Sequence, residues 1–378
     1  MMRDQIPLFR PVIAEDAIDA AAAVLRSGWP GPGPVVEQFE EAFARRVGAA
    51  HAVAVTSGTA ALHLALRLLD LASGDEVITS PITFVGANEV ILHERCRPVF
   101  ADVDPLTGNL DPASVLAAVG VRTRAIVTTH LGGRPSDLTE LRAVAERAGV
   151  ALIEDAAHAC GSTYQGRPIG GHGNTVAFSF QATKNLPTVD GGMVCLPSAT
   201  DAARARRLRW MGIDRTTWSR NGTTGYDWAY GVAEVGHKYA MNDLNAALGL
   251  AQLAHVDAGN ARRVAIADRY QCDLSKTPGI VAVPIPSDRT SARYLFPVVV
   301  EDRDLVHEAM KQRGIGTGAH YRRNDHHPVF GGEFDLPGAE QYWTHTLSLP
   351  MHLALSDCDV DVVMATLGEV VPPRPAAR

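Results

Sequence analysis

The chain has 378 residues, a formal net charge of −7, 46% hydrophobic residues and 20% charged residues, proportions typical of a soluble globular protein. The acidic balance and the lack of a basic block argue against nucleic acid as the main partner, and no apolar run is long enough to cross a bilayer. The five cysteines are scattered without a CxxC pair, so we expect free thiols in a reducing, cytoplasmic compartment.

The N-terminal part is predicted to be an arm followed by two helices. Residues 1–12 are expected to be extended. A helix over residues 15–25 begins with acidic side chains, as the helix dipole favours. The proline- and glycine-rich residues 27–34 interrupt the helical pattern. Val36, Phe39 and Phe43 then mark the apolar face of a helix over residues 35–47.

From His51 onward, short apolar runs alternate with helical patterns. The runs are continuous, as in strands that are covered on both faces; they lie at residues 52–55, 76–79, 98–101, 125–128, 150–153, 176–178 and 193–196. One intervening helix is predicted from Asp137 as N-cap with Glu140 three residues on, and from Gly149 as its end. Repeated strand–helix units predict an α/β fold with a mainly parallel sheet, whose ligands bind beyond the carboxyl ends of the strands.

After about residue 240 the pattern changes. We expect a long helix from Asn242 through Arg263 and beyond, a strand over residues 294–300, a helix within residues 302–310, a final helix around residues 359–370 and a proline-rich tail. The length of the chain also favours two domains. We therefore predict a large α/β domain over residues 13–250 and a small α+β domain over residues 251–378.

Polar residues follow several of the predicted strands. Ser57-Gly58-Thr59 stands where a strand gives way to a helix, whose free N–H groups suit a phosphate, although ordinary capping explains the same pattern. Asp155 ends a buried strand and needs a partner there; a protonated pyridine nitrogen would serve, and so would the cap of the next turn. Phe84 could cover a flat ring, although core packing is the commoner role of a phenylalanine.

Lys184 lies between two apolar runs, just after Ser179. An amine held between buried strands is a candidate nucleophile. We therefore predict that Lys184 forms a Schiff base with pyridoxal 5'-phosphate, with the other strand ends supplying the phosphate site and the partner of the pyridine nitrogen.

Together these residues resemble the DegT/DnrJ/EryC1/StrS family of sugar aminotransferases, which are fold-type-I pyridoxal phosphate enzymes. The resemblance covers nearly the whole chain, and its motifs are residues 57–62, 81–84, 154–158, 179–185 with Gly191-Gly192, 236–242 and 347–352. It implies a large domain with a mainly parallel sheet and a smaller α+β C-terminal domain.

The resemblance also implies roles for individual residues. Lys184 would carry the cofactor and move the substrate proton, Asp155 would pair with the pyridine nitrogen, Gly58, Thr59 and Ser179 would hold the phosphate, and Phe84 would stack on the ring. His158 stands where many relatives carry a glutamine that faces the phenolic oxygen of the cofactor. Lys238 stands where relatives carry an asparagine or lysine that reaches the cofactor phosphate of the neighbouring subunit, which implies a homodimer with shared active sites.

The segment with His320 and Tyr321 is similar to the loop that contacts the nucleotide-sugar in the family. Arg322 or Arg323 could grip a diphosphate, although a solvated basic patch explains them equally well. His320, His326 and His327 lack a regular ligand spacing, so no metal is predicted.

The function implied is transfer of an amino group, from L-glutamate by family analogy, to a nucleotide-linked keto-sugar. A dTDP-4-keto-deoxy sugar is the first choice, ahead of a 3-keto sugar or a cyclitol ketone. Lys184 favours transamination over the dehydration carried out by relatives with a histidine there. A non-catalytic regulator would need an added DNA-binding segment, and the glycine run at 314–318 lacks the strand and the acidic residue of a nicotinamide site.

Overall fold

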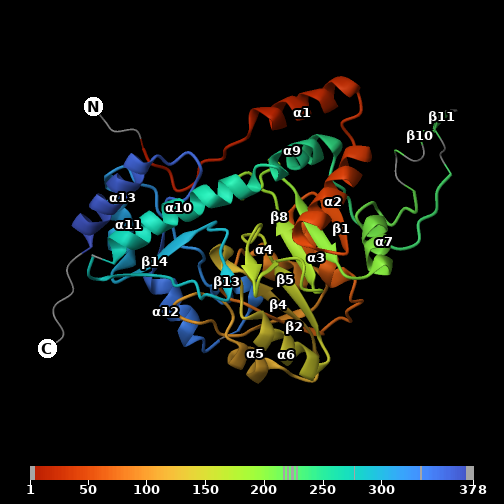
Figure 1. Ribbon diagram of the computed structural model, residues 1–378. Helices are drawn as coiled ribbons and strands as arrows, with labels where there is room; N and C mark the ends of the chain where they lie inside the picture. Colours follow the sequence, from red (N-terminus) through yellow and green to blue (C-terminus); the bar gives the residue numbers. More distant parts are fainter. Residues whose placement is uncertain are drawn as a thin grey trace.

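The computed structural model describes residues 5–215, 218, 221–222, 225–226, 229–275, 277–332 and 334–371. Its centre is a seven-stranded sheet in the order β1-β9-β8-β5-β4-β2-β3 (Figure 1). The strands are β1 (His51–Val55), β2 (Glu76–Thr79), β3 (Arg97–Phe100), β4 (Thr123–Thr129), β5 (Ala151–Asp155), β8 (Thr175–Ser179) and β9 (Gly192–Leu196). Only β9 runs against its neighbours in this sheet, which confirms the mainly parallel sheet.

Helices cover both faces of this sheet. Apolar side chains of α3 (Gly58–Arg67), α4 (Gly86–His93) and α7 (Ala199–Leu208) pack on one face. The other face is covered by α2 (Pro34–Val47), α5 (Pro112–Ala118), α6 (Leu138–Ala148) and α9 (Asp243–Leu253). Since both faces are covered, the strands are apolar throughout, and for that reason their positions were predictable to within about two residues.

The first helices begin and end as their sequences predict. The first helix, α1 (Glu15–Ser27), ends at Gly28 and α2 ends at Gly48, and both glycines are left-handed, with φ of 78° and 71°. That backbone conformation costs a glycine little and a residue with a side chain considerably more. Pro34 begins α2, where its missing N–H loses no hydrogen bond.

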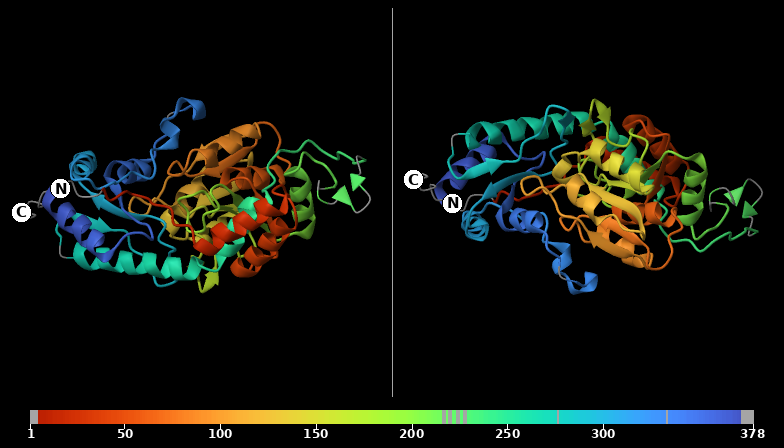
Figure 2. Two further views of the ribbon diagram at one scale, coloured as in Figure 1. Left: turned by 90° about the horizontal axis from the view of Figure 1, so that it is seen from above. Right: turned by 90° about the horizontal axis from the view of Figure 1, so that it is seen from below.

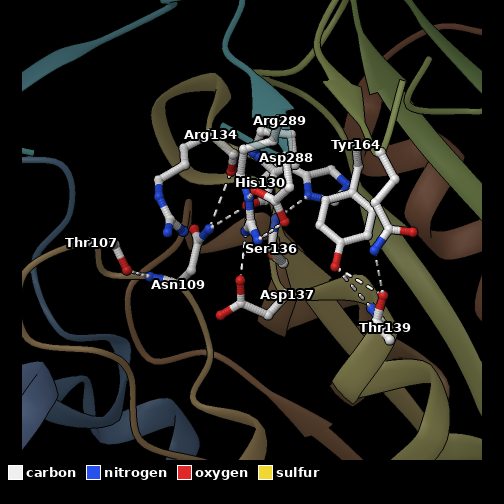
Figure 3. Close-up of polar contacts among 12 residues, drawn as sticks. Thr107, Asn109, His130, Arg134, Ser136, Asp137, Thr139, Tyr164, Asp288 and Arg289 are labelled. Carbon is white, nitrogen blue, oxygen red and sulfur yellow. Dashed lines mark hydrogen bonds and ion pairs between the residues drawn. The ribbon is translucent and has the colours of Figure 1, made fainter. Parts of the chain in front are cut away.

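Two helix predictions were wrong in detail. The predicted long helix from Asn242 is two helices, α9 and α10 (Val256–Leu274), because the backbone tightens at their junction, where the His255 N–H donates to the Gln252 carbonyl. The Asp137 side chain does not cap α6. Its carboxylate accepts instead from Arg289, at 2.5 Å, because this arginine reaches it from the C-terminal half of the chain (Figure 3).

The C-terminal part has its own small sheet and core. The antiparallel strands β12 (Ile280–Ala282), β14 (Phe296–Val300) and β15 (Thr346–Leu349) pack with α10, α11 (Arg303–Gln312) and α13 (Asp357–Val370). The predicted strand at 294–300 thus begins two residues later than expected. α10 runs from the large sheet to these elements (Figure 2). The division into domains at residue 250 stays a prediction, and the proline-rich tail lies outside the described residues.

The remaining elements are short, and some join the two parts. α12 (Pro337–His345) packs beside Phe100 and Leu131. A second small sheet consists of β13 (Arg289–Thr290), β6 (Thr163–Tyr164) and β7 (Arg167–Pro168). It pairs a strand of the C-terminal half with the segment between β5 and β8 of the large sheet. A two-stranded ribbon consists of β10 (Asn221–Gly222) and β11 (Gly225–Tyr226), and single 3₁₀ turns lie at Leu131–Gly133, Asn324–His326 and Pro328–Phe330.

The N-terminal arm is extended from Gln5 onward and lies against the C-terminal part; the first four residues of the predicted arm lie outside the described residues. Ile6 forms a bridge with Ile315, the Pro7 carbonyl accepts from His352, and the Leu8 carbonyl accepts from the Met351 N–H. Among the described residues, no helix combines the length and the apolarity that crossing a membrane requires.

Candidate active site

A cavity of about 450 Å³ lies where β1, β5 and β8 end. Nine of the predicted site residues line it: Gly58, Thr59, Phe84, Asp155, His158, Ser179, Lys184, His320 and Tyr321. Thr83, Gln181, Asp190 and Tyr294, which the sequence did not single out as site residues, line it too. The carboxyl ends of parallel strands therefore gather these residues, as expected for a fold of this kind.

The N-terminus of α3 forms a donor-rich corner of this cavity. Ser57 caps the helix, since its Oγ accepts from the Ala60 N–H at 3.1 Å. The N–H groups of Gly58 and Thr59 belong to the first turn and have no intrahelical partner. A Cβ on Gly58 would stand 2.7 Å from the Ser179 Cβ, so only glycine lets β8 approach so closely. Free N–H groups, two hydroxyls and a helix dipole fit a phosphate.

Asp155 is the last residue of β5 and is only 5% exposed. Its Oδ1 accepts from the Ala157 N–H at 3.0 Å. Burial raises the pKa of Asp155 above its ordinary value, and this backbone hydrogen bond and the charge of Lys184 oppose the rise. Among the described residues no cation forms an ion pair with it. A buried acid that lacks a cation suits a protonated ring nitrogen.

Lys184 stands in the loop after β8, and its Nζ lies 4.1 Å from the centroid of the Tyr294 ring. The Tyr294 hydroxyl is 3.0 Å from the Thr183 Oγ1, which holds the ring in place beside the amine. Tyr294 was missed because an aromatic residue next to an apolar run is typical of a core strand. Only the fold brings it to Lys184.

His158 is 4% exposed and makes two hydrogen bonds. Its Nδ1 accepts from the Gly132 N–H at 3.3 Å, and its Nε2 lies 3.1 Å from the Tyr321 hydroxyl. The ring also stacks on Tyr294, with centroids 4.3 Å apart and planes 22° apart. Burial, followed by the charges of Lys184 and His320, holds the pKa of His158 well below its ordinary value. The histidine is therefore neutral.

A buried pair of side chains, His130 and Glu154, lies next to Asp155, whose carbonyl accepts from the His130 N–H. The His130 Nδ1 accepts from the Ser136 N–H at 3.0 Å (Figure 3). Its Nε2–H therefore donates to Glu154, at 2.9 Å. Burial alone would raise the pKa of Glu154, but the hydrogen bond and charge of His130, together with the Asn174 amide, lower it. The His130–Glu154 pair ties the end of β4 to the end of β5 and so holds Asp155 in place.

Three predicted residues lie away from this cavity. The Lys238 Nζ stands 3.5 Å from the centroid of the Trp210 ring. Arg322 is exposed and lines a separate open hollow with His326 and His327. The alternative that Arg323 binds a diphosphate does not hold in this structure, because that side chain is buried and pairs with Asp325 at 2.5 Å and with Glu340 at 2.8 Å.

Comparison with known proteins decides the family. The model of the DegT/DnrJ/EryC1/StrS aminotransferase family matches residues 11–368. The chain belongs to this family. It is a pyridoxal-phosphate-dependent aminotransferase of the sugar aminotransferase group, and its cavity offers the phosphate corner, the buried acid and the lysine that this cofactor needs.

Individual relatives are similar to this chain over almost their full lengths. The spore coat polysaccharide biosynthesis protein SpsC of Bacillus subtilis is 40% identical, with 97% of each chain covered. The sugar aminotransferase CalS13 of Micromonospora echinospora is 36% identical, with a TM-score of 0.90, 96% of this chain and 99% of that chain covered. Spr1654 of Streptococcus pneumoniae, solved in a PLP form, is 28% identical, with a TM-score of 0.90 and coverage of 97% and 98%; it has also been solved in a PMP form.

Proposed function

We propose that this aminotransferase moves an amino group from L-glutamate to the ketone of a nucleotide-linked sugar. The observation that carries the proposal is one cavity that joins Lys184, Asp155 and the Gly58–Thr59 corner. The sugar class is supported by the solved neighbour named a sugar aminotransferase. By family analogy we favour a dTDP-4-keto-deoxy sugar, made for an aminosugar-bearing natural product such as an antibiotic, over a 3-keto sugar or a cyclitol ketone.

Each residue of the cavity has a role in this proposal. Pyridoxal phosphate, when bound, supplies the carbonyl that carries the amino group and the ring that withdraws electrons. The N–H groups of Gly58 and Thr59, with the Ser179 hydroxyl, bind the phosphate. Asp155 holds the proton of the ring nitrogen, and the half-exposed Phe84 covers the ring face. The Lys184 Nζ takes the carbon-bound proton of the substrate and returns it.

The most direct test uses the two half-reactions. Protein loaded with the pyridoxamine form is offered keto-sugar nucleotides one at a time, and recovery of the visible absorbance band of the lysine-bound cofactor identifies the acceptor. L-Glutamate should reverse the change. Lys184→Ala should lack the band altogether. A wild-type protein that stays colourless with pyridoxal phosphate, or that accepts none of the sugars, would contradict the proposal.

Shared active sites in a homodimer are part of the same proposal, and the position of Lys238 outside its own chain's cavity supports them. Lys184→Ala and Lys238→Ala subunits should each form nearly inactive dimers. A hybrid of the two has one site with both lysines intact, so mixing and refolding the variants should restore activity. A mixture as inactive as its parents would exclude sharing through Lys238. The cytoplasmic location stays a prediction.

A further inference from the structure

The hydrogen bonds of His158 determine which of its nitrogens carries the proton. The Gly132 N–H points at Nδ1, and a backbone N–H can only donate. Nδ1 is therefore unprotonated, and the proton of the neutral ring is on Nε2. Consequently His158 donates from Nε2 to the Tyr321 oxygen, 3.1 Å away. The ring also stacks on Tyr294, with centroids 4.3 Å apart, and this contact favours the same orientation.

This arrangement also orients the hydroxyl of Tyr321. Because the Tyr321 oxygen accepts from His158, its own hydrogen must point elsewhere. Within the part of the chain that the structure describes, His158 is the only hydrogen-bond partner of this hydroxyl. Tyr321 lines the cavity, so its hydrogen is available to a bound molecule. Burial, followed by the nearby Tyr294 and Asp155, raises the pKa of Tyr321 well above its ordinary value, so the hydroxyl remains a donor.

We propose that His158, held as the Nε2–H tautomer by Gly132, fixes the Tyr321 hydroxyl as a hydrogen-bond donor to the ketone oxygen of the acceptor. This inference rests on the proposed function, because it assigns a residue to the acceptor half-reaction. Tyr321 touches the substrate, and His158 is its positioning residue. In this proposal the histidine at position 158 acts on the acceptor through Tyr321.

Among the oxygens of the acceptor, the ketone oxygen is the one that we expect to receive the hydrogen bond from Tyr321. The Lys184 Nζ lies against the Tyr294 ring, and the same ring stacks on His158, which holds Tyr321. All four side chains line one cavity, so the amine of Lys184 and the hydroxyl of Tyr321 face the same bound molecule. Amino transfer takes place where Lys184 attaches, so the ketone must come to this end of the cavity. A donor at the ketone oxygen makes the carbon more electrophilic, and it selects for a carbonyl at that ring position.

The first experiment separates the two half-reactions of Tyr321→Phe in single-turnover measurements. With the pyridoxamine form and dTDP-4-keto-6-deoxyglucose, or the acceptor that the panel identifies, the rate should fall about tenfold, the size of one lost hydrogen bond. The L-glutamate half-reaction should stay within about twofold. Tyr342→Phe is the matched control, since it removes a buried hydroxyl that bonds the His320 carbonyl at 3.3 Å without lining the cavity. It should leave both rates unchanged.

The second experiment tests the positioning role of His158. His158→Leu should slow the acceptor half-reaction as Tyr321→Phe does, and the double variant should be no slower than either, because both act through one hydrogen bond. His158→Gln, which keeps a donor and an acceptor, should recover part of the rate. Nitrogen-15 NMR of the cofactor-free wild type should show the His158 Nε2–H tautomer between pH 6 and pH 8, a measurement that does not depend on activity.

Several results would overturn the inference. They are an unchanged acceptor rate in Tyr321→Phe, an equal loss in both half-reactions, or an Nδ1–H tautomer in the NMR spectra. A shift in the pH titration of the cofactor absorbance of Tyr321→Phe, with the acceptor rate retained, would place the hydrogen bond on the cofactor instead. Failure of the proposed function looks different, because the wild type itself would then aminate no keto-sugar.

Discussion

A single methyl group on Gly58 should disturb the phosphate corner. In Gly58→Ala the new Cβ would lie 2.7 Å from the Ser179 Cβ and 3.3 Å from its Cα, so α3 and β8 must move apart. Overpacking of this kind costs about 1–3 kcal/mol. If that cost falls on the phosphate site, affinity for pyridoxal phosphate drops roughly 5- to 150-fold, at about 1.4 kcal/mol per factor of ten.

Absorbance titration of the cofactor-free variant measures this affinity, and urea unfolding measures its stability. Gly368→Ala is the matched control, because a Cβ there meets nothing within 4 Å and the residue lies inside α13. It should gain about 0.5–1 kcal/mol of stability and keep the wild-type affinity. Adding Ser179→Gly to Gly58→Ala removes the nearest atom and should recover stability but not affinity. Wild-type affinity and stability in Gly58→Ala would refute the close-approach argument.

Three further predictions follow from the site and its surroundings. Asp155→Ala should keep the wild-type circular dichroism spectrum but lose at least about tenfold in turnover, because the charge-assisted hydrogen bond to the ring nitrogen is worth about 1.5–3 kcal/mol; near-normal turnover would remove its assigned role. Burial, followed by the charge of Lys184, lowers the pKa of His320 to about 4, so the unfolded chain binds more protons and the free energy of unfolding should fall as the pH drops from about 6.5 to 4. In His320→Asn the free energy of unfolding, measured with urea at several pH values, should fall less steeply over this pH range. A pH dependence identical to that of the wild type would contradict the prediction. Arg323→Ala should cost about 3–5 kcal/mol in urea unfolding, because it leaves the carboxylate of Asp325 buried without its cation, whereas the exposed Arg322→Ala should change stability by less than about 0.5 kcal/mol.

The strands of the large sheet could be predicted because each is a short run with no polar face. The same reasoning placed Gly58, Asp155 and Lys184 at strand ends, and the structure brings all three to one cavity. The reversed direction of β9 could not be predicted, since an apolar run such as Met193 to Leu196 suits a parallel and an antiparallel neighbour equally well.

Contacts between distant parts of the chain could not be predicted from the sequence either. Asp137 and Glu140 satisfied the local pattern of a capping box, but Arg289 comes from 152 residues away and takes the carboxylate. Likewise, nothing near Tyr294 indicates that its ring will lie under the amine of Lys184. Local patterns predict local structure, whereas these two contacts depend on how the C-terminal part packs on the large sheet.

The extended arm has a consequence for the order in which the molecule is built. Phe9 stacks on Tyr294, with ring centroids 5.5 Å apart, and its neighbours Ile6 and Leu8 bond to residues 314–316 and to Met351. The arm is synthesised hundreds of residues before these partners. During translation the arm therefore remains without these contacts until the C-terminal partners have been synthesised. Contacts that span such a length of chain also form slowly. The contact of Phe9 with Tyr294, the ring beside Lys184, is thus among the last to form, and a nascent chain that stops short of Met351 lacks one of the partners that hold the arm.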